Sequence, residues 1–200
     1  MFAPDARRWL PALVAFALLI ALPLRAVASD VVIREDEKDG VKGLVATFVV
    51  NQDRDVVFEV LNDIKGFKKV FPNILEVKLV RESESSRDVF FRVDAVLSEA
   101  SYTLRRNHSR SKIVDIITWN RLSGDANVIR GSWTLSDGDK PGVTRVVYSS
   151  YVDVSALVPT STVRSIAMGK VEEMVVRIRK ACDERAAAAP SPAPAPAPGE

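Results

Sequence analysis

Residues 161–185, STVRSIAMGKVEEMVVRIRKACDER, form the stretch that decides the fold. At about 100° per residue, the apolar side chains of this stretch fall within roughly a third of a helix circumference. They are Val163, Ala167, Val171, Met174, Val175, Ile178, Ala181 and Cys182. The pattern predicts one long helix that lays a single apolar stripe on a sheet. Gly169 falls on the opposite side, where glycine costs about 1 kcal/mol relative to alanine, and we interpret it as a point at which the helix can bend.

The sequence before this helix predicts a sheet, because apolar residues alternate with polar ones over several short segments. We expect about seven strands, at 44–50, 75–79, 89–97, 102–108, 113–119, 129–135 and 143–154. Turn-forming residues at 136–142 separate the last two segments, which is typical of neighbouring antiparallel strands. Helical spacing at 53–64 and a short turn at 67–71, ended by Pro72, predict a helical pair directly after the first strand. The fold class is therefore α+β.

The first 28 residues have the features of a signal peptide. Arg7 and Arg8 precede an apolar run of 16 residues, 9–24, and the small residues that a signal peptidase recognises follow at 26–28. A membrane span needs about 20 apolar residues, so an uncleaved anchor is the weaker alternative. We expect a cleaved signal peptide at 1–28 and export, to the periplasm of a bacterium.

The other end of the chain, 186–200, consists almost entirely of Ala and Pro and offers nothing to bury, so we expect a disordered tail. What remains, 30–185, is long enough for one domain with a single core. Without 1–28, Lys and Arg fall from 28 to 25, and Asp and Glu fall from 26 to 25, so the mature protein is formally neutral. A neutral chain lacks the positive field of nucleic-acid-binding proteins, and we expect no nucleic-acid partner.

The counts of cysteine and histidine exclude several kinds of chemistry. Cys182 is the only cysteine, so the chain cannot form an internal disulfide. His108 is the only histidine, so His/Cys metal clusters, and Ser-His-Asp or Cys-His sites without it, are excluded. The glycines are scattered and form no phosphate-binding loop. We therefore expect no metal and no cofactor.

Seven short motifs follow one another in an order that resembles a known family. They are Val56-Val57-Phe58 through Leu61-x-Asp63, Phe67-x-x-x-Phe71-Pro72-Asn73, Trp119, Gly124-Asp125, Gly131-Ser132-Trp133, Thr144-Arg145-Val146-Val147-Tyr148 and Leu157-Val158-Pro159. Together they resemble the START-like superfamily, in the branch with polyketide cyclases and coenzyme Q-binding proteins. The resemblance covers nearly all of 43–182.

This resemblance implies the helix-grip fold, in which an antiparallel sheet curls around a long C-terminal helix and leaves a tunnel for a hydrophobic ligand. The segment 30–185 would then be a START-like ligand-binding domain. The family includes lipid and quinone carriers, aromatases and chaperone-like binders, so it does not fix the activity. Our first expectation is an exported protein that binds or transports a lipid or an isoprenoid quinone. The alternatives are a small aromatase/cyclase-like enzyme and a non-catalytic domain that holds envelope proteins together.

Residues on the expected inner faces of the strands and of the last helix are the candidates to line the tunnel. They are Phe91, Val93, Tyr102, Leu104, Arg106, Trp133, Tyr148, Ala167, Val171 and Met174. For each of them the alternative is ordinary core packing, since apolar stripes more often form core than pockets. Arg106 and Tyr102 share a strand face with Leu104, and if they point inward they could hold the polar head of a ligand, such as a carboxylate or a quinone oxygen.

An enzyme would need a positioned acid or base, and its candidates would be His108, Arg106, Tyr102, Asp94 and Tyr148. The segment 105–112 is so polar that we interpret it as a hairpin turn with an exposed His108, and we assign no catalytic residue.

Lys65, Lys68 and Lys69 form a basic cluster beside Phe67. This cluster could touch an anionic membrane transiently, although a solvated surface is the more usual role of such a run.

Overall fold

The computed structural model describes residues 31–95, 98–153 and 160–188, with the side chains of the last helix described from Met168 onward. The predicted signal peptide at 1–28 and most of the predicted tail lie outside these residues. The strands are β1 (Val32–Lys38), β2 (Val41–Val50), β3 (Ile74–Glu82), β4 (Ser86–Asp94), β5 (Glu99–Arg110), β6 (Val114–Gly124), β7 (Val128–Asp137) and β8 (Thr144–Asp153). The helices are α1 (Arg54–Asn62), α2 (Phe67–Val70) and α3 (Thr160–Ala188).

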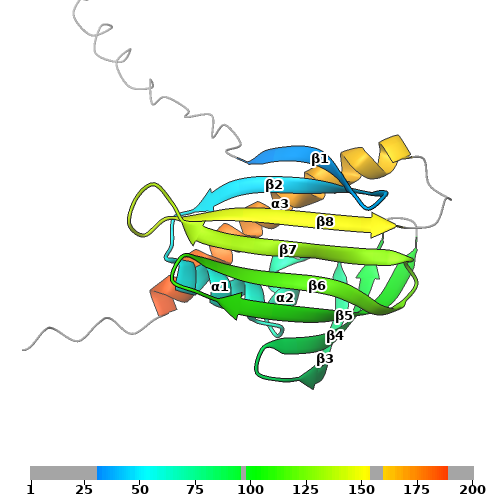
Figure 1. Cartoon of the computed structure of the whole chain (residues 1–200), viewed down its shortest axis with the longest axis horizontal. Helices are drawn as coiled ribbons and strands as arrows, with labels where there is room; N and C mark the ends of the chain where they lie inside the picture. The colour runs from blue at the N-terminus through cyan, green and yellow to red at the C-terminus, as the bar shows by residue number, and fades with distance from the viewer. Residues whose placement is uncertain (1–30, 96–97, 154–159, 189–200) are drawn as a thin grey trace, which may run out of the picture.

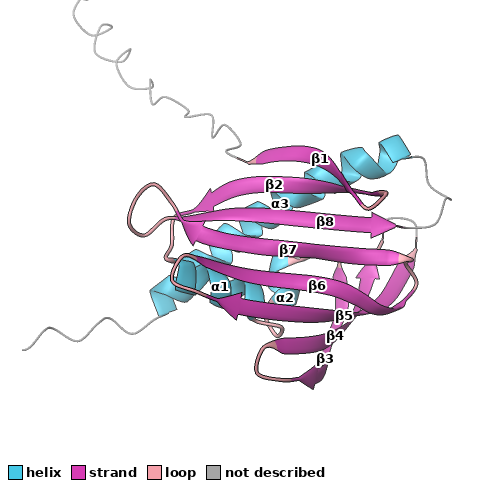
Figure 2. Cartoon of the chain, in the orientation of Figure 1, coloured by secondary structure: helices cyan, strands magenta, loops and turns pink. Residues whose placement is uncertain are grey.

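All eight strands belong to one antiparallel sheet with the order β1-β2-β8-β7-β6-β5-β4-β3. Strands β3 to β8 follow one another as neighbours, and β2 pairs with β8, so that Ala46 lies opposite Tyr148. The sheet is curved and unclosed, and the three helices lie on one side of it (Figures 1 and 2). This arrangement is the helix-grip fold that we expected from the sequence.

The strand β1 adds an eighth strand to the expected set of about seven. Its sequence, VIREDEK, is too charged to show an apolar face, and its side chains are mostly exposed. It pairs with β2 through the backbone from Val32, opposite Thr47, to Lys38, opposite Val41. Charged side chains are common on edge strands, where they discourage pairing with other chains.

The long helix α3 covers the sheet through the apolar stripe predicted for it. Within the described side chains, Val171, Met174, Val175, Ile178 and Cys182 are buried. Val163 and Ala167 precede the part of α3 whose side chains are described. Helix α3 continues past residue 185 to Ala188, in agreement with the high helix propensity of alanine.

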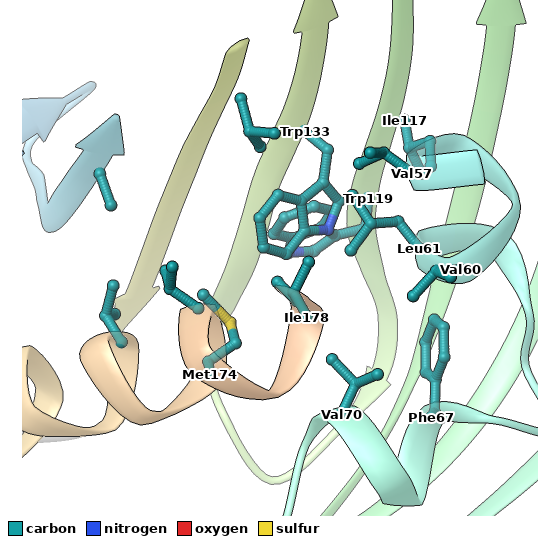
Figure 3. Packing of buried hydrophobic residues seen from close by; sticks show 14 of the residues in the cluster. Val57, Val60, Leu61, Phe67, Val70, Ile117, Trp119, Trp133, Met174 and Ile178 are labelled. Atoms are coloured by element: carbon teal, nitrogen blue, oxygen red, sulfur yellow. The ribbon is translucent and has the colours of Figure 1, made fainter. Parts of the chain in front are cut away.

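The core lies between the concave face of the sheet and the helices. Val57 and Leu61 of α1 are fully buried, as are Ile117 of β6 and Ile178 of α3. Figure 3 shows the rings of Trp119 and Trp133 directed from the sheet toward Met174 and Ile178. Among the described residues, no helix has the length and apolar character needed to span a membrane.

One glycine shapes the inner face of the sheet. A Cβ atom at Gly131 in β7 would lie 2.3 Å from Cζ2 of Trp119 and 2.2 Å from the backbone oxygen of Ser149. The Trp119 ring therefore lies directly over the β7 backbone, where only glycine leaves room for it.

Candidate functional site: a cavity under the long helix

A cavity of about 310 Å³ lies between α3, the segment around α2 and the inner face of the sheet. Its volume is at the lower end of the range for small-molecule pockets. The lining residues are Leu44, Phe67, Phe71, Pro72, Asn73, Ile74, Phe91, Val93, Tyr102, Leu104, Arg106, Trp119, Ile129, Trp133, Tyr148, Lys170, Val171 and Met174. Three of them, Pro72, Asn73 and Lys170, are exposed and mark the side on which the cavity meets solvent.

The strand period explains why residues from distant parts of the sequence meet here. Tyr102, Leu104 and Arg106 alternate along β5, so their side chains point to the same face. In β4 the residue opposite Tyr102 is Phe91, which lies on that face too. Leu104 in turn contributes to the hydrophobic core. Strand β5 thus directs one arginine and one tyrosine into a largely apolar space.

Aromatic rings form most of the cavity wall. The Trp133 ring lies 4.3 Å from the Tyr148 ring between centroids, and Trp119 lies 5.9 Å from Tyr148. On the other side, Phe91 lies 6.0 Å from Phe67 and 5.7 Å from Tyr102. Such rings offer large apolar surfaces, and tyrosine adds a hydroxyl that can form hydrogen bonds.

Arg106 is the buried charge of the cavity, with 5% of its surface exposed. Its Nη2 donates a hydrogen bond of 2.8 Å to the backbone oxygen of Leu61, in the last turn of α1. Its guanidinium carbon lies 4.6 Å from the centroid of the Phe67 ring. Its Nη1 is buried and has no hydrogen-bond partner among the described residues. Burial, and secondly the like charge of Arg87, lowers the pKa of Arg106 to about 9, so the side chain remains cationic at pH 7.

The two cavity tyrosines are neutral at physiological pH. Burial, and secondly the repulsion that an ionised Tyr148 would exert, raises the pKa of Tyr102 to about 12. Burial also raises the pKa of Tyr148. Both hydroxyls can therefore donate or accept hydrogen bonds, but they are weak proton donors at pH 7.

His108 does not belong to the lining of the cavity, and the interpretation of 105–112 as a hairpin turn was wrong for most of that segment. Strand β5 continues to Arg110, and His108 lies within it, half-buried, with its ring 6.0 Å from that of Phe58. Burial, and secondly the charge of Arg87, lowers the pKa of His108. Asp94, another candidate acid, ends β4 and is exposed, and it does not line the cavity either.

Nine of the ten residues expected to line a tunnel do line this cavity, and the tenth, Ala167, precedes the described side chains of α3. Nine further residues line the cavity without having been predicted from the sequence: Leu44, Phe67, Phe71, Pro72, Asn73, Ile74, Trp119, Ile129 and Lys170. A signal existed for several of these, because Phe67, Phe71 and Trp119 belong to the motifs that carry the family resemblance. The expected basic cluster, Lys65, Lys68 and Lys69, is exposed beside this region.

Within 31–95, 98–153 and 160–188, no group of three or more His, Cys, Asp or Glu side chains could hold a metal ion. The chemistry that the cavity offers is therefore that of a largely apolar container with one buried cation, Arg106, one exposed cation, Lys170, and two tyrosine hydroxyls.

Comparison with solved structures finds the same fold in lipid transfer proteins. Human StAR-related lipid transfer protein 5 matches with a TM-score of 0.69 and 10% identity, over 80% of this chain and 89% of that chain. The STAR-related lipid transfer protein of Xanthomonas axonopodis matches with a TM-score of 0.67 and 12% identity, over 78% and 95% of the two chains.

A third similar structure is an enzyme, the Zhui aromatase/cyclase from Streptomyces sp. R1128. It matches with a TM-score of 0.57 and 20% identity, over 78% of this chain and 94% of that chain. No curated protein sequence matches the chain. The sequence profile of the family described as polyketide cyclase / dehydrase and lipid transport matches residues 50–179. The helix-grip fold, the cavity under α3 and this match agree, and the chain belongs to the polyketide cyclase / dehydrase and lipid transport family of the START-like superfamily.

Proposed function

We propose that the protein binds a hydrophobic small molecule in the cavity under α3 and carries it through the cell envelope of a bacterium. The observation that supports this proposal is the lining itself, in which aromatic and aliphatic side chains surround very few polar groups. A ligand that buries about 500 Å² of apolar surface gains on the order of 12 kcal/mol before the costs of association. Binding at useful affinity therefore needs no catalytic group.

A lipid or an isoprenoid quinone remains our first suggestion for the ligand. The exposed Lys65, Lys68 and Lys69 adjoin Phe67 and Phe71, which line the cavity. Each lysine near an anionic lipid surface contributes about 1 kcal/mol to attraction, so this cluster would hold the cavity close to a membrane during loading. Export rests on the features of residues 1–28.

An aromatase or cyclase is the second candidate, because Arg106, Tyr102 and Tyr148 all line the cavity and could orient a poly-ketone chain. The described lining contains no carboxylate and no histidine. Proton transfer would fall to tyrosines whose raised pKa makes them poor donors at pH 7. This chemistry favours binding over catalysis.

Native mass spectrometry of protein purified from its own envelope tests the carrier. We expect a lipid or quinone mass on the wild type. The variant Val171→Phe should lose that mass, because Val171 lines the cavity and is 6% exposed. The variant Val176→Phe is the matched control, since Val176 is on the same helix but 65% exposed.

An empty wild-type protein, or equal loading of both variants, would contradict the carrier. An empty protein that retains envelope proteins on purification would instead favour the interaction domain. For the enzyme, loss of turnover of a candidate poly-ketone in Tyr102→Phe, with binding retained, would favour catalysis.

A further inference from the structure

The cavity has an uneven balance of charge. Two cationic side chains, Arg106 and Lys170, line it, and none of the described lining residues is acidic. Lys170 is exposed and has Glu173 at 3.9 Å, so its charge is partly balanced. Arg106 is buried, and among the described residues it forms no ion pair. Buried charges in proteins are normally paired, so this one lacks an expected counter-ion.

We infer that the ligand is an anionic amphiphile whose acidic group pairs with Arg106 while its apolar part fills the aromatic portion of the cavity. This inference rests on the proposed function and narrows its ligand class. A carboxylate or phosphate would accept hydrogen bonds from the guanidinium, which forms its strongest contacts with such planar or charged acceptors. Nη1 of Arg106 is buried and has no partner among the described residues, so a small movement of the side chain would bring an unused donor to this contact.

A purely structural role for Arg106 does not account for these features. A neighbouring arginine, Arg87, lies directly opposite Arg106 in the β4–β5 register and donates a hydrogen bond of 2.8 Å to the next carbonyl of α1, that of Asn62. Arg87 is paired with Glu82 at 2.6 Å and does not line the cavity. Both arginines donate hydrogen bonds to the end of α1, but only Arg106 lines the cavity, and no acidic side chain among the described residues pairs with it.

The strand geometry sets the approximate length of the ligand. Arg106 and Tyr102 are four residues apart on β5, which places them about 13 Å apart at the rise of an extended strand. Leu104 lies between them on the same face, and the Phe91 ring lies beside Tyr102. An extended ten-carbon chain is about this long, so a medium-chain acid with its carboxylate at Arg106 would reach Tyr102.

A pair of probes that differ only in charge tests the inference on the full chain, freed of bound lipid. The probes are decanoate and 1-decanol at pH 7.5, followed by calorimetry and by the fluorescence of Trp119 and Trp133, which line the cavity. We expect the wild type to bind decanoate at least tenfold more tightly than decanol. Arg106→Met should weaken decanoate binding at least tenfold and change decanol binding less than threefold. Arg106→Lys should recover part of the preference for the acid.

The matched control is Arg87→Met, which removes an arginine from the same helix end and should leave the preference unchanged. Equal binding of acid and alcohol to the wild type would overturn the inference while leaving the proposed function intact. The inference would also be overturned if Arg87→Met lost the preference for decanoate over decanol as much as Arg106→Met does. If the wild type bound neither probe, both the inference and the proposed function would fall. The wild-type comparison alone decides the matter if Arg106→Met does not fold.

Discussion

A buried arginine without a counter-ion should destabilise the empty protein, so we expect Arg106→Met to unfold at a higher temperature than the wild type. Methionine has a similar length and no charge, and it would lie beside the Phe67 ring in a cavity lined mostly by apolar side chains. Replacing a buried charge by an apolar side chain of similar volume is often neutral or stabilising.

The magnitude follows from the surroundings of Arg106. Burial lowers its pKa from 12.5 to about 9, which at 1.36 kcal/mol per pH unit corresponds to roughly 5 kcal/mol. Against this gain, the variant loses the hydrogen bond to Leu61, about 2 kcal/mol, and the contact with the Phe67 ring, about 1 kcal/mol. The net gain of about 2 kcal/mol should raise the Tm by roughly 4–8 °C for a domain of this size.

The pH dependence gives this prediction a second test. Above pH 9 the folded protein has begun to release the proton of Arg106, whereas the unfolded chain still holds it. The free energy of unfolding of the wild type therefore rises relative to that of the variant as pH increases. Well below pH 9 the full difference in the free energy of unfolding between the variant and the wild type is present. By pH 10 the advantage of Arg106→Met should shrink by about 1 kcal/mol.

Thermal and urea unfolding of ligand-free wild type, Arg106→Met and Arg87→Met measure these differences. Arg87 is paired with Glu82 and its side chain is 25% exposed, so its replacement should lower stability by about 1 kcal/mol. The two arginine variants are thus expected to change stability in opposite directions. A decrease of the Tm in Arg106→Met, similar to that in Arg87→Met, would refute the reasoning about the unpaired charge.

Three further predictions concern stability and reactivity elsewhere in the fold. Gly169→Ala should raise the free energy of unfolding by about 1 kcal/mol, because an added Cβ meets nothing within 4 Å; an unchanged or lower Tm would contradict this. Burial raises the pKa of the Cys182 thiol to about 12, so a thiol reagent at pH 8 should label this cysteine no faster than the protein unfolds. Rapid labelling under native conditions would contradict this prediction. Asp115→Ala should lower the free energy of unfolding by roughly 3 kcal/mol in urea titrations, because fully buried Asp115 pairs with Arg54 and Arg110. A loss below about 1 kcal/mol would contradict the importance given to these ion pairs.

The sequence predicted the parts of the fold that have a regular apolar period. The stripe on α3 could be recognised because Val171, Met174 and Ile178 recur at helical spacing, and the structure buries all three. Glu173 and Arg177, four residues apart on this helix, also form an ion pair, with Nη2 of Arg177 2.8 Å from the carboxylate. In such segments the residues that make an element stable are close together in the sequence.

The segments that the sequence did not predict depend on distant partners. The polar sequence at the end of β5 suggests a turn, yet the segment is a strand. Arg105 forms two hydrogen bonds with Asp88 of β4, and Arg110 pairs with buried Asp115 of β6. Strand β1 is held by the backbone of β2 and needs no apolar face of its own. The cavity depends on the gap left between α2, α3 and the sheet, which periodicity cannot specify.

The pairing of β2 with β8 has a consequence for how the chain folds. Gly43 lies opposite Tyr151, so this pairing closes a loop of about a hundred residues, and the loss of chain entropy slows its formation. An emerging chain has an unpaired inner edge on β2 until β8 is present, and the helix that covers the core follows β8 in the sequence. Folding should therefore wait for the complete chain, and molecules truncated before residue 144 should expose a long strand edge and aggregate.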